Sequence, residues 1–461
     1  MDYDVIVIGS GPAGYTAACL FAKNNLKTLV VEKDKVGGVC LNVGCIPTKT
    51  LLTIAENYSL IKENEITGVS CTDVNIDKTK ISQKVLEVSQ NMSKSIDYLF
   101  KKNGVTIVLG DANFIDKNTI SVNGVNYSAK FIIIATGSRN KDYSNFLDAN
   151  IPKDKIITST EALFLENIPK SITILGAGAI GVEFAYIYSS FGSEVTLIEY
   201  FPHILPNMDE ECGKTLERSF KKKNIKVITD AKVSKINYES ENYVVNYTRK
   251  EKDEKITSEY VLFAMGRTPN SNINGIEKLN LEMEKTFIKV NKSMQTSVEN
   301  IYAIGDIIAA KPLLAHVAYD EARVCVDNIL NIDEKFDINY KFVPFCIYTE
   351  PQIASFGFTE KEAKEKGYDF KVLKSFFKAS GKAMAMNKQD GFVKILVENQ
   401  GQKIIGASIV GANATEIIHE ILICAKNNLN IKDLSHTMHA HPTLSELISD
   451  TAKIYWNGNL H

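Results

Sequence analysis

Continuous apolar runs, rather than alternating ones, mark the predicted strands of this chain. Two such runs, Asp4 to Ile8 and Thr28 to Val31, flank an alanine-rich stretch from Tyr15 to Ala22 that is typical of a helix. A strand that is apolar at every position is buried on both faces, as in a parallel sheet. The order strand, helix, strand therefore predicts a βαβ unit at the start of the chain.

The same pattern returns further along the chain. An apolar run from Ser171 to Leu175 precedes a predicted helix from Val182 to Ser190 and a second run from Val195 to Ile198. In each copy a Gly-x-Gly-x-x-Gly turn follows the first strand: Gly9, Gly11 and Gly14, then Gly176, Gly178 and Gly181. Such a turn lets a pyrophosphate touch the backbone at a helix N-terminus. The repeat therefore predicts two dinucleotide sites.

An acidic residue ends the second strand of each copy. Glu32 and Glu199 lie at the same offset from the first glycine of their turns. A carboxylate at this position hydrogen-bonds the 2′-hydroxyl of a ribose and repels a 2′-phosphate. We therefore expect NAD rather than NADP at the second site.

The segments between and after the two copies predict where the chain leaves each domain, and they predict a third domain. Strands that end in small-residue turns run from Phe131 to Gly137 and from Val261 to Asn270, and a strand at Ile301 to Asp306 is assigned back to the first domain. The predicted fold class is α/β, with two Rossmann-like domains and a C-terminal α+β domain. The predicted boundaries are 1–147 with 271–339, then 148–270, then 340–461.

Composition excludes several classes of function. The chain has 461 residues, 44% hydrophobic and 23% charged, with a net charge of -2, so it carries no electrostatic footprint for nucleic acid or a membrane surface. The run Lys221 to Lys223 is interpreted as a solvated helix face. No apolar run of about 18 residues is evident. The first strand begins almost at Met1 and the eight cysteines are scattered, so we expect a cytoplasmic protein.

Two cysteines stand out from the scattered set because they follow the first nucleotide motif. Cys40 and Cys45 lie behind the pair Gly37 and Gly38. A glycine-rich turn into a helix favours thiolate over thiol, which predicts a redox disulfide beside a flavin, although buried inert cysteines remain the alternative. Five residues of regular helix would hold the cysteines near the bridging limit of about 7 Å, so we expect a distortion at Gly44. The disulfide assigns FAD to the first nucleotide site.

Three of the seven histidines cluster between His436 and His441. A zinc site is disfavoured because no cysteine or acid with ligand spacing accompanies them, so no metal is predicted. A general base with an orienting carboxylate fits better, with His441 and Glu446 as candidates. Surface histidines without function are the alternative.

The whole chain resembles the flavoprotein disulfide oxidoreductases and, among them, the members that oxidise dihydrolipoamide. The motifs that carry the resemblance are Gly9 to Gly14, Gly38 to Lys49, Ala135-Thr136-Gly137, Gly176 to Gly181 with Glu183, Gly305-Asp306, and His439 to Glu446.

The resemblance implies roles for individual residues. Cys40 would exchange with substrate, Cys45 would contact the flavin, and Lys49 with Glu183 would form an ion pair near the flavin ring. His441 and Glu446 would form an acid/base pair that reaches the cysteines of the other subunit of a homodimer. The implied contacts to FAD are Gly9, Gly11, Pro12, Ala13, Gly14, Glu32, Lys49, Thr136, Gly137, Asp306 and Ala318, and those to NAD are Gly176, Gly178, Gly181, Glu199 and Gly266.

The implied activity is oxidation of protein-bound dihydrolipoyl groups with NAD⁺. The implied partner is a lipoyl-bearing acyltransferase or H-protein of a 2-oxo acid dehydrogenase, acetoin or glycine-cleavage complex. Two other family members are disfavoured. Glutathione reductase would need basic residues for a 2′-phosphate at the position of Glu199, and mercuric reductase would have a C-terminal cysteine pair. A non-catalytic flavoprotein that serves as an interaction subunit is the alternative from another class.

Overall fold

The computed structural model describes residues 1–62, 68–69, 71–309, 312–333 and 336–458. By its contacts the chain divides into two compact units. The first comprises residues 1–50, 79–141 and 266–338, and the second comprises 51–78, 142–265 and 339–461. The predicted boundaries of three domains stay a prediction.

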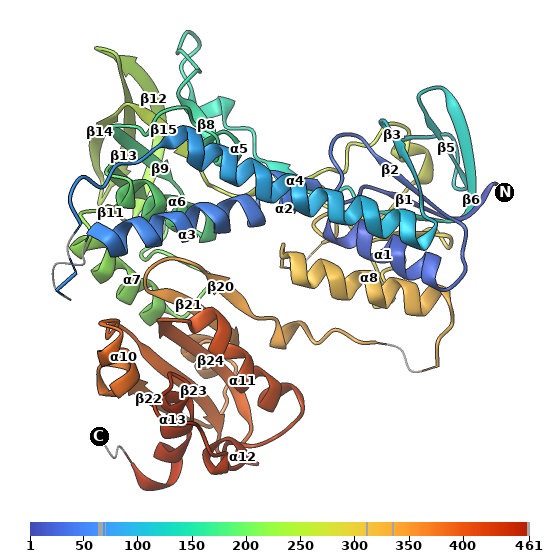
Figure 1. Ribbon diagram of the computed structural model, residues 1–461. Helices are drawn as coiled ribbons and strands as arrows, with labels where there is room; N and C mark the ends of the chain where they lie inside the picture. Colours follow the sequence, from blue (N-terminus) through green and yellow to red (C-terminus); the bar gives the residue numbers. More distant parts are fainter. Residues whose placement is uncertain (63–67, 70, 310–311, 334–335, 459–461) are drawn as a thin grey trace. The chain divides into compact units, whose positions relative to one another are not determined.

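The first unit is built on a sheet with a parallel centre (Figure 1). Its strand order is β3-β2-β1-β6-β5-β4, with β19 also paired to β6. β1 runs parallel to β2 and to β6, and β19 runs parallel to β6, so the segment from Ile301 returns to the first sheet as predicted. The strands are β1 (Tyr3–Ile8), β2 (Thr28–Glu32), β3 (Thr106–Leu109), β4 (Asn113–Phe114), β5 (Thr119–Val122), β6 (Val125–Ile134) and β19 (Ile301–Ala303).

Helices and short strands complete this unit. α1 (Pro12–Lys23) packs beside α8 (Ala315–Ile329), where the Tyr15 and Tyr319 rings lie 6.0 Å apart. α4 (Lys78–Asn103) is the long amphipathic helix of the unit, with Val85 and Ile96 among its buried residues. The remaining elements are α2 (Gly38–Asn42), β7 (Ser138–Asn140), β16 (Arg267–Pro269), η3 (Ile276–Leu279), β17 (Met283–Glu284) and β18 (Phe287–Ile288), and α3 (Cys45–Lys62) begins in this unit.

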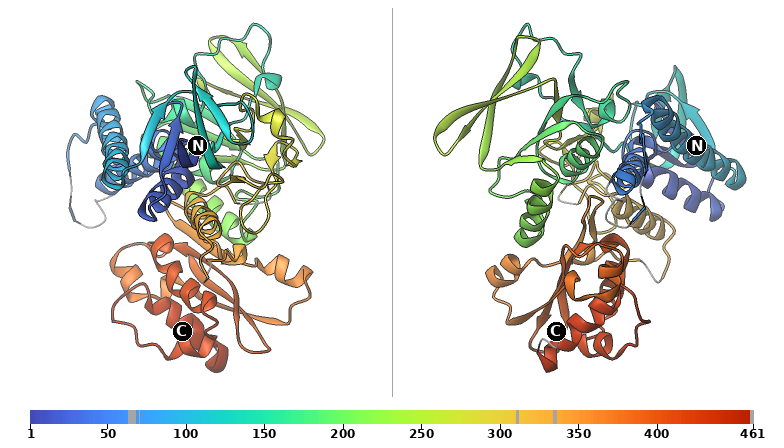
Figure 2. Two further views of the ribbon diagram at one scale, coloured as in Figure 1. Left: turned by 90° about the vertical axis from the view of Figure 1, so that its right-hand side faces the viewer. Right: turned by 60° about the vertical axis from the view of Figure 1, so that its left-hand side comes forward.

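The second unit holds the second βαβ copy. Its parallel sheet has the order β11-β10-β9-β15-β8. An antiparallel sheet of β12, β13 and β14 follows in the chain, and Figure 2 shows it in yellow-green as a separate layer. The elements are η2 (Ser144–Phe146), β8 (Ile156–Thr158), α5 (Ser159–Ala162), β9 (Ser171–Leu175), α6 (Ala179–Ser190), β10 (Glu194–Ile198), α7 (Glu210–Lys222), β11 (Lys226–Ile228), β12 (Ala231–Glu239), β13 (Asn242–Arg249), β14 (Lys252–Ser258) and β15 (Tyr260–Phe263).

The C-terminal part of the second unit is the predicted α+β region. Its antiparallel sheet has the order β20-β21-β24-β23-β22, and α11 packs beside β24 and β21. The elements are η4 (Tyr340–Phe342), β20 (Phe345–Ile347), β21 (Gln352–Gly357), α9 (Glu360–Glu365), β22 (Phe370–Phe376), η5 (Phe377–Ala379), α10 (Gly381–Ala385), β23 (Phe392–Glu398), β24 (Ile404–Gly411), α11 (Ala414–Lys426), α12 (Ile431–His436) and α13 (Glu446–Asn457).

Among the described residues, one helical stretch, Gly38–Lys62, has the length and apolar composition that a membrane crossing would need. It consists of two helices, α2 and α3, that meet at Val43 and Gly44. Length and composition alone are weak evidence for a crossing.

Candidate active site

Both glycine turns have the geometry of an anion cradle. Gly9 has a φ of 101°, which favours glycine, and a Cβ on Gly14 would lie 1.9 Å from the Gly9 carbonyl oxygen. Gly11 caps α1, and a Cβ there would meet nothing within 4 Å. No side chain therefore covers the backbone where a pyrophosphate would approach the helix N-terminus.

The second turn repeats this geometry. Gly176 has a φ of 96°, and a Cβ on Gly181 would lie 1.9 Å from the Gly176 carbonyl oxygen. Gly178 caps α6 and has open space where its Cβ would be. The two predicted nucleotide sites thus have the same local structure.

The two acidic residues also occupy equivalent positions. One Glu32 carboxylate oxygen accepts from the backbone N–H of Ser10 at 2.9 Å, and one Glu199 oxygen accepts from the N–H of Ala177. Both residues are buried. Each carboxylate therefore lies beside its own turn, where a ribose would follow the pyrophosphate.

Other predicted FAD contacts converge on the first turn. A Cβ at Gly305 would lie 3.2 Å from the Ala13 Cβ and 3.6 Å from the Ala318 Cβ, so the Gly305-Asp306 turn packs against the starts of α1 and α8. The Asp306 carboxylate accepts from the Ser138 hydroxyl at 2.6 Å. The structure thus brings Ala13, Ala318 and Asp306 together.

The exit strands approach both glycine turns from the side. A Cβ at Gly9 would meet the Ala135 carbonyl oxygen and the Thr136 Cα, and one at Gly176 would meet the Ala264 carbonyl oxygen and the Met265 Cα. Thr136 exchanges hydrogen bonds with Asn270, and Gly137 has a φ of 66°. Gly266 follows Met265 directly and belongs to the first unit.

The two cysteines lie on either side of a break between helices. Cys40 lies in α2, whereas Cys45 is the first residue of α3. A Cβ at Gly44 would lie 2.8 Å from the Val39 carbonyl oxygen and 3.3 Å from the Cys40 Cα. The chain therefore folds back on itself at Gly44, which is the local distortion that the sequence predicts there.

The surroundings of Cys40 act against a thiolate at that residue. Both cysteines are thiols in the structure. A hydrogen bond to Cys45, burial and the negative charge of Cys45 raise the pKa of the Cys40 thiol, and the charge of Lys49 opposes this only in part. The dipole of the longer helix α3 acts on Cys45 instead, because Cys45 is the first residue of that helix.

The cysteine segment packs on the first nucleotide turn. A Cβ on Gly38 would lie 2.8 Å from the Gly11 Cα, and the Gly37 N–H lies 3.1 Å from the Ser10 carbonyl oxygen. From the other side, the Ser93 hydroxyl of α4 donates to the Val36 carbonyl oxygen. The chain therefore holds the cysteines against the predicted FAD cradle.

One interaction of each residue of the predicted ion pair, Lys49 and Glu183, is described by the structure. The charge of Lys49 acts on Cys40, as above. Glu183 is buried in α6, and its carboxylate accepts from the Tyr348 N–H at 3.2 Å. Their ion pair stays a prediction.

His441 and Glu446 form a hydrogen-bonded pair. The His441 Nδ1 lies 2.9 Å from one Glu446 carboxylate oxygen, and the other oxygen accepts from the Thr443 N–H at 2.7 Å. The Thr443 and His441 hydrogen bonds lower the pKa of the Glu446 carboxyl. The His441 side chain is 80% exposed, which leaves its Nε2 open to a partner from outside.

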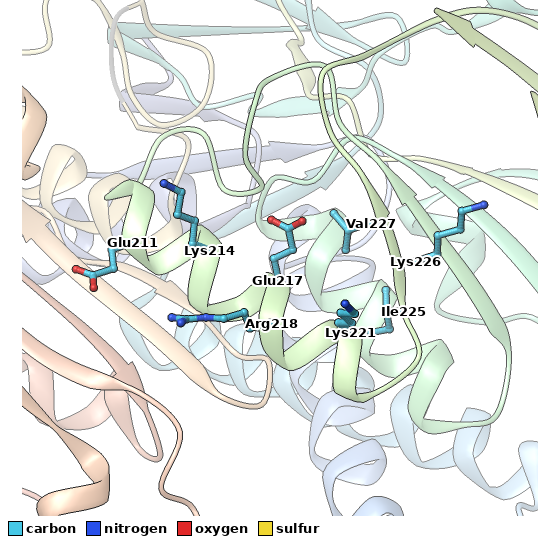
Figure 3. A pocket seen from close by; sticks show the side chains of 8 residues that line it. All are labelled: Glu211, Lys214, Glu217, Arg218, Lys221, Ile225, Lys226 and Val227. Atoms are coloured by element: carbon cyan, nitrogen blue, oxygen red, sulfur yellow. The ribbon is translucent and has the colours of Figure 1, made fainter. Parts of the chain in front are cut away.

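A charged groove elsewhere in the second unit contains none of these residues. It lies along α7 and β11 (Figure 3), and its lining combines two apolar side chains with residues of both signs of charge. Its lining residues are Glu211, Lys214, Glu217, Arg218, Lys221, Ile225, Lys226 and Val227. The run that includes Lys221 is therefore part of a mixed-charge surface rather than a basic patch.

Sequence reasoning missed other polar groups near these residues. The Tyr15 and Tyr319 hydroxyls hydrogen-bond each other at 2.7 Å, and the charges of both cysteines help to raise the pKa of Tyr15, after burial and the Tyr319 hydrogen bond. His439 contacts Glu420 on α11. These partners lie far apart in sequence, so no local spacing signals them.

Two dinucleotide cradles, with a cysteine pair packed on the first, define a flavoprotein of the disulfide-exchanging class. Two family models agree: pyridine nucleotide-disulphide oxidoreductase matches residues 3–322, and the dimerisation domain of that family matches residues 343–452. The chain belongs to the pyridine nucleotide-disulphide oxidoreductase family. The resemblance drawn from the motifs is therefore confirmed, as are the fold class and the cofactors FAD and NAD.

Among its relatives, the chain is 36% identical to the dihydrolipoyl dehydrogenase of Bacillus subtilis, over 100% of this chain and 98% of that one. It is 37% identical to the dihydrolipoyl dehydrogenase of Mycoplasma pneumoniae, with 98% of each covered. Among solved structures, the HOCl-induced flavoprotein disulfide reductase RclA of Escherichia coli superposes with a TM-score of 0.88 at 26% identity, covering 98% of this chain and 100% of that one. LpdA of Mycobacterium tuberculosis has the same fold, with a TM-score of 0.89 at 23% identity over 98% and 99%.

Proposed function

We propose that this chain is an NAD-dependent oxidoreductase that oxidises dihydrolipoyl groups to lipoyl groups through a Cys40–Cys45 disulfide. The observation that carries the proposal is the fold-back at Gly44, which sets the two cysteines side by side on the first glycine turn. Full-length relatives named dihydrolipoyl dehydrogenase support the choice of substrate. A homodimer is supported by the dimerisation domain at residues 343–452.

In the proposed reaction, His441 takes the proton of one dihydrolipoyl thiol. The substrate thiolate attacks the Cys40 sulfur, the bond between the cysteines breaks, and Cys45 leaves as a thiolate. The second substrate thiol then attacks the first substrate sulfur, and its proton passes to the departing Cys40 sulfur, which releases a cyclic disulfide and leaves Cys40 as a thiol. The substrate loses two electrons and two protons, and the cysteine pair gains the electrons.

Bound FAD and NAD supply the route by which those two electrons leave the dithiol as a hydride on NAD⁺. The residues that would hold FAD are those of the first turn with Glu32, and those that would hold NAD are the second turn with Glu199. Glu199 is buried beside its turn, so a 2′-phosphate would meet a carboxylate there. NAD is therefore the expected acceptor, which disfavours a glutathione reductase that uses NADP.

The proposed partner is a separate lipoyl-bearing acyltransferase or H-protein in the cytoplasm. The exposed side chain of His441 supports a substrate group that arrives on another protein. We also propose that His441 serves the cysteines of the partner subunit in the homodimer.

Replacement of Cys45 with serine tests the proposal. We expect Cys45→Ser to retain FAD and to lose dihydrolipoamide oxidation entirely, because no disulfide can form. Cys71→Ser is a matched control, since Cys71 is also exposed and lies outside the cysteine pair. Dihydrolipoamide turnover by the flavin-loaded Cys45→Ser protein would refute the assignment.

A further inference from the structure

Two histidines of the loop between α12 and α13 have opposite surroundings. The His441 side chain is 80% exposed, whereas the His439 side chain is 9% exposed. The proposed function uses His441 as the base and leaves His439 without a role. A histidine whose ring is held by neighbouring groups, two residues from an exposed base, can act on that base through the backbone.

Both ring nitrogens of His439 face hydrogen-bond acceptors. Its Nδ1 lies 2.9 Å from the Thr437 carbonyl oxygen, and its Nε2 contacts the Glu420 carboxylate on α11. A neutral imidazole carries only one N–H. Since a carbonyl and a carboxylate both accept, the two contacts are satisfied together when both nitrogens carry protons. The arrangement is that of an imidazolium paired with a carboxylate.

Glu446 holds the same loop from its C-terminal end, as the contact of His439 with Glu420 holds it from the other side. Glu446, the first residue of α13, accepts from the Thr443 N–H and from His441. The Thr443 hydroxyl donates to the Ala440 carbonyl oxygen at 2.8 Å. His441 therefore lies between an anchor on α11, supplied by His439, and an anchor on α13, supplied by Glu446.

Charged groups from each neighbouring helix face this region. The charges of His441 and His439 add to the hydrogen bonds that lower the pKa of Glu446. On the α11 side, burial and then the negative charges of Glu420 and Asp433 raise the pKa of the Cys424 thiol. Carboxylates on α11 and α13 therefore lie near His439, because Glu420 contacts its ring and the charge of His439 acts on Glu446.

We propose that His439 is a positioning residue for His441. As an imidazolium held between the Thr437 carbonyl and the Glu420 carboxylate, it ties the loop to α11 and keeps His441 in the orientation that Glu446 sets. This role rests on the proposed function, in which His441 is the base.

The test replaces Glu420 with glutamine in the full-length, flavin-loaded protein. Glu420→Gln keeps the size of the side chain and removes the charge that holds the second proton on His439. We expect kcat/KM for dihydrolipoamide to fall about tenfold, a loss of about 1.4 kcal/mol in transition-state stabilisation. Glu416→Gln, an exposed position one turn away on α11, is the matched control and should have no effect.

NADH oxidation with an electron-accepting dye separates positioning from misfolding, because the dye takes electrons from the flavin and needs no base. We expect dye reduction to be unchanged in both variants. His439→Gln, as a second variant, should lose dihydrolipoamide turnover to the same degree and also keep dye reduction. Unaltered kcat/KM for dihydrolipoamide in Glu420→Gln would overturn the proposal.

Nitrogen-15 NMR of the histidine-labelled protein at neutral pH reads the protons directly. We expect two protonated ring nitrogens on His439 in the wild-type protein and one in Glu420→Gln. A single protonated nitrogen in the wild type would contradict the imidazolium. Absence of dihydrolipoamide turnover in the wild type would refute the proposed function and the role of His439 in it. NMR would still detect a doubly protonated His439 in that case, so failure of the proposed function can be distinguished from failure of the imidazolium assignment.

Discussion

At the scale of single residues, environment separates groups that the sequence presents as equals. His439 and His441 are two residues apart, yet the His439 ring contacts two acceptors and is 9% exposed, whereas the His441 side chain is 80% exposed. Cys40 has a raised pKa beside Cys45, although the glycines before it favour a thiolate on sequence grounds. The chemistry of each side chain depends on the residue that contacts it in the fold, and the separation of residues in the sequence does not identify that residue.

The Glu446 carboxylate supplies a prediction at this scale. Its lowered pKa means that its stabilising contribution is fully present above the pKa of the unfolded chain and is lost as the pH falls through the lower folded value. Glu446→Gln leaves the His441 ring without a charged partner. We expect kcat/KM for dihydrolipoamide to drop about 10²-fold, in the range of general acid/base effects.

The pH profile of kcat/KM checks this prediction. The loss should persist down to acidic pH, where an ordinary carboxyl would already be protonated in the wild type. Glu416→Gln serves again as a control for loss of a carboxylate. A variant as active as the wild type at neutral pH would show that Glu446 does not orient the base.

At the scale of elements, the decisive feature is the break between α2 and α3. Gly44 allows the Val39 carbonyl and the Cys40 Cα to approach closely. We expect Gly44→Ala to force the segments apart and to impair disulfide formation, because its Cβ would lie 2.8 Å from the Val39 carbonyl oxygen. Thiol titration of the air-oxidised, denatured protein should find two more reactive thiols in this variant than in the wild type.

Gly381→Ala is the control for that substitution. Gly381 has open space at its Cβ position and lies in α10. Equal thiol counts in Gly44→Ala and the wild type would show that the fold-back does not govern the disulfide.

The elements also show what the sequence could and could not predict. The buried strands β1, β9 and β15 were predictable, because each is a nearly continuous apolar run without regular polar alternation. The antiparallel sheet of β12 to β14 was not predicted, since its partly exposed strands mix polar and apolar residues. Among the site residues, the two glycine turns and their acidic partners, Glu32 and Glu199, could be predicted from their spacing in the sequence. The contact of His439 with Glu420 could not, because it depends on how α11 packs.

At the scale of the whole molecule, a buried ion network in the second unit joins α7 to the C-terminal sheet. The Lys394 side chain is 3% exposed and lies 2.9 Å from a carboxylate oxygen of Asp209 and from one of Glu211. Asp209 caps α7, whereas Lys394 belongs to β23. The network therefore connects the nucleotide-binding sheet to the dimerisation domain.

We expect Lys394→Met to lower the free energy of unfolding by about 3–5 kcal/mol, because it leaves the buried Asp209 carboxylate without its cation. Hydrogen bonds to Asp209 and Glu211 overcome the effect of burial and raise the pKa of Lys394. The stabilisation is therefore fully present below the pKa of an unfolded lysine and is lost as the pH rises through the higher folded value.

Urea denaturation at neutral and at alkaline pH measures this effect. Lys214→Met is the control, since Lys214 is largely exposed on α7 and pairs with Glu210, and we expect it to change stability by less than about 1 kcal/mol. Equal stabilities of Lys394→Met and the wild type would show that the network does not hold the two parts together.

The central claim is that Cys40 and Cys45 form a reversible disulfide that exchanges electrons with the flavin. Anaerobic titration of the flavin-loaded protein with dihydrolipoamide tests it most directly. We predict a long-wavelength absorbance band from a thiolate in contact with oxidised flavin, which is complete at two electrons per chain and absent in Cys45→Ser. Direct bleaching of the flavin at two electrons, with no such band, would contradict the account.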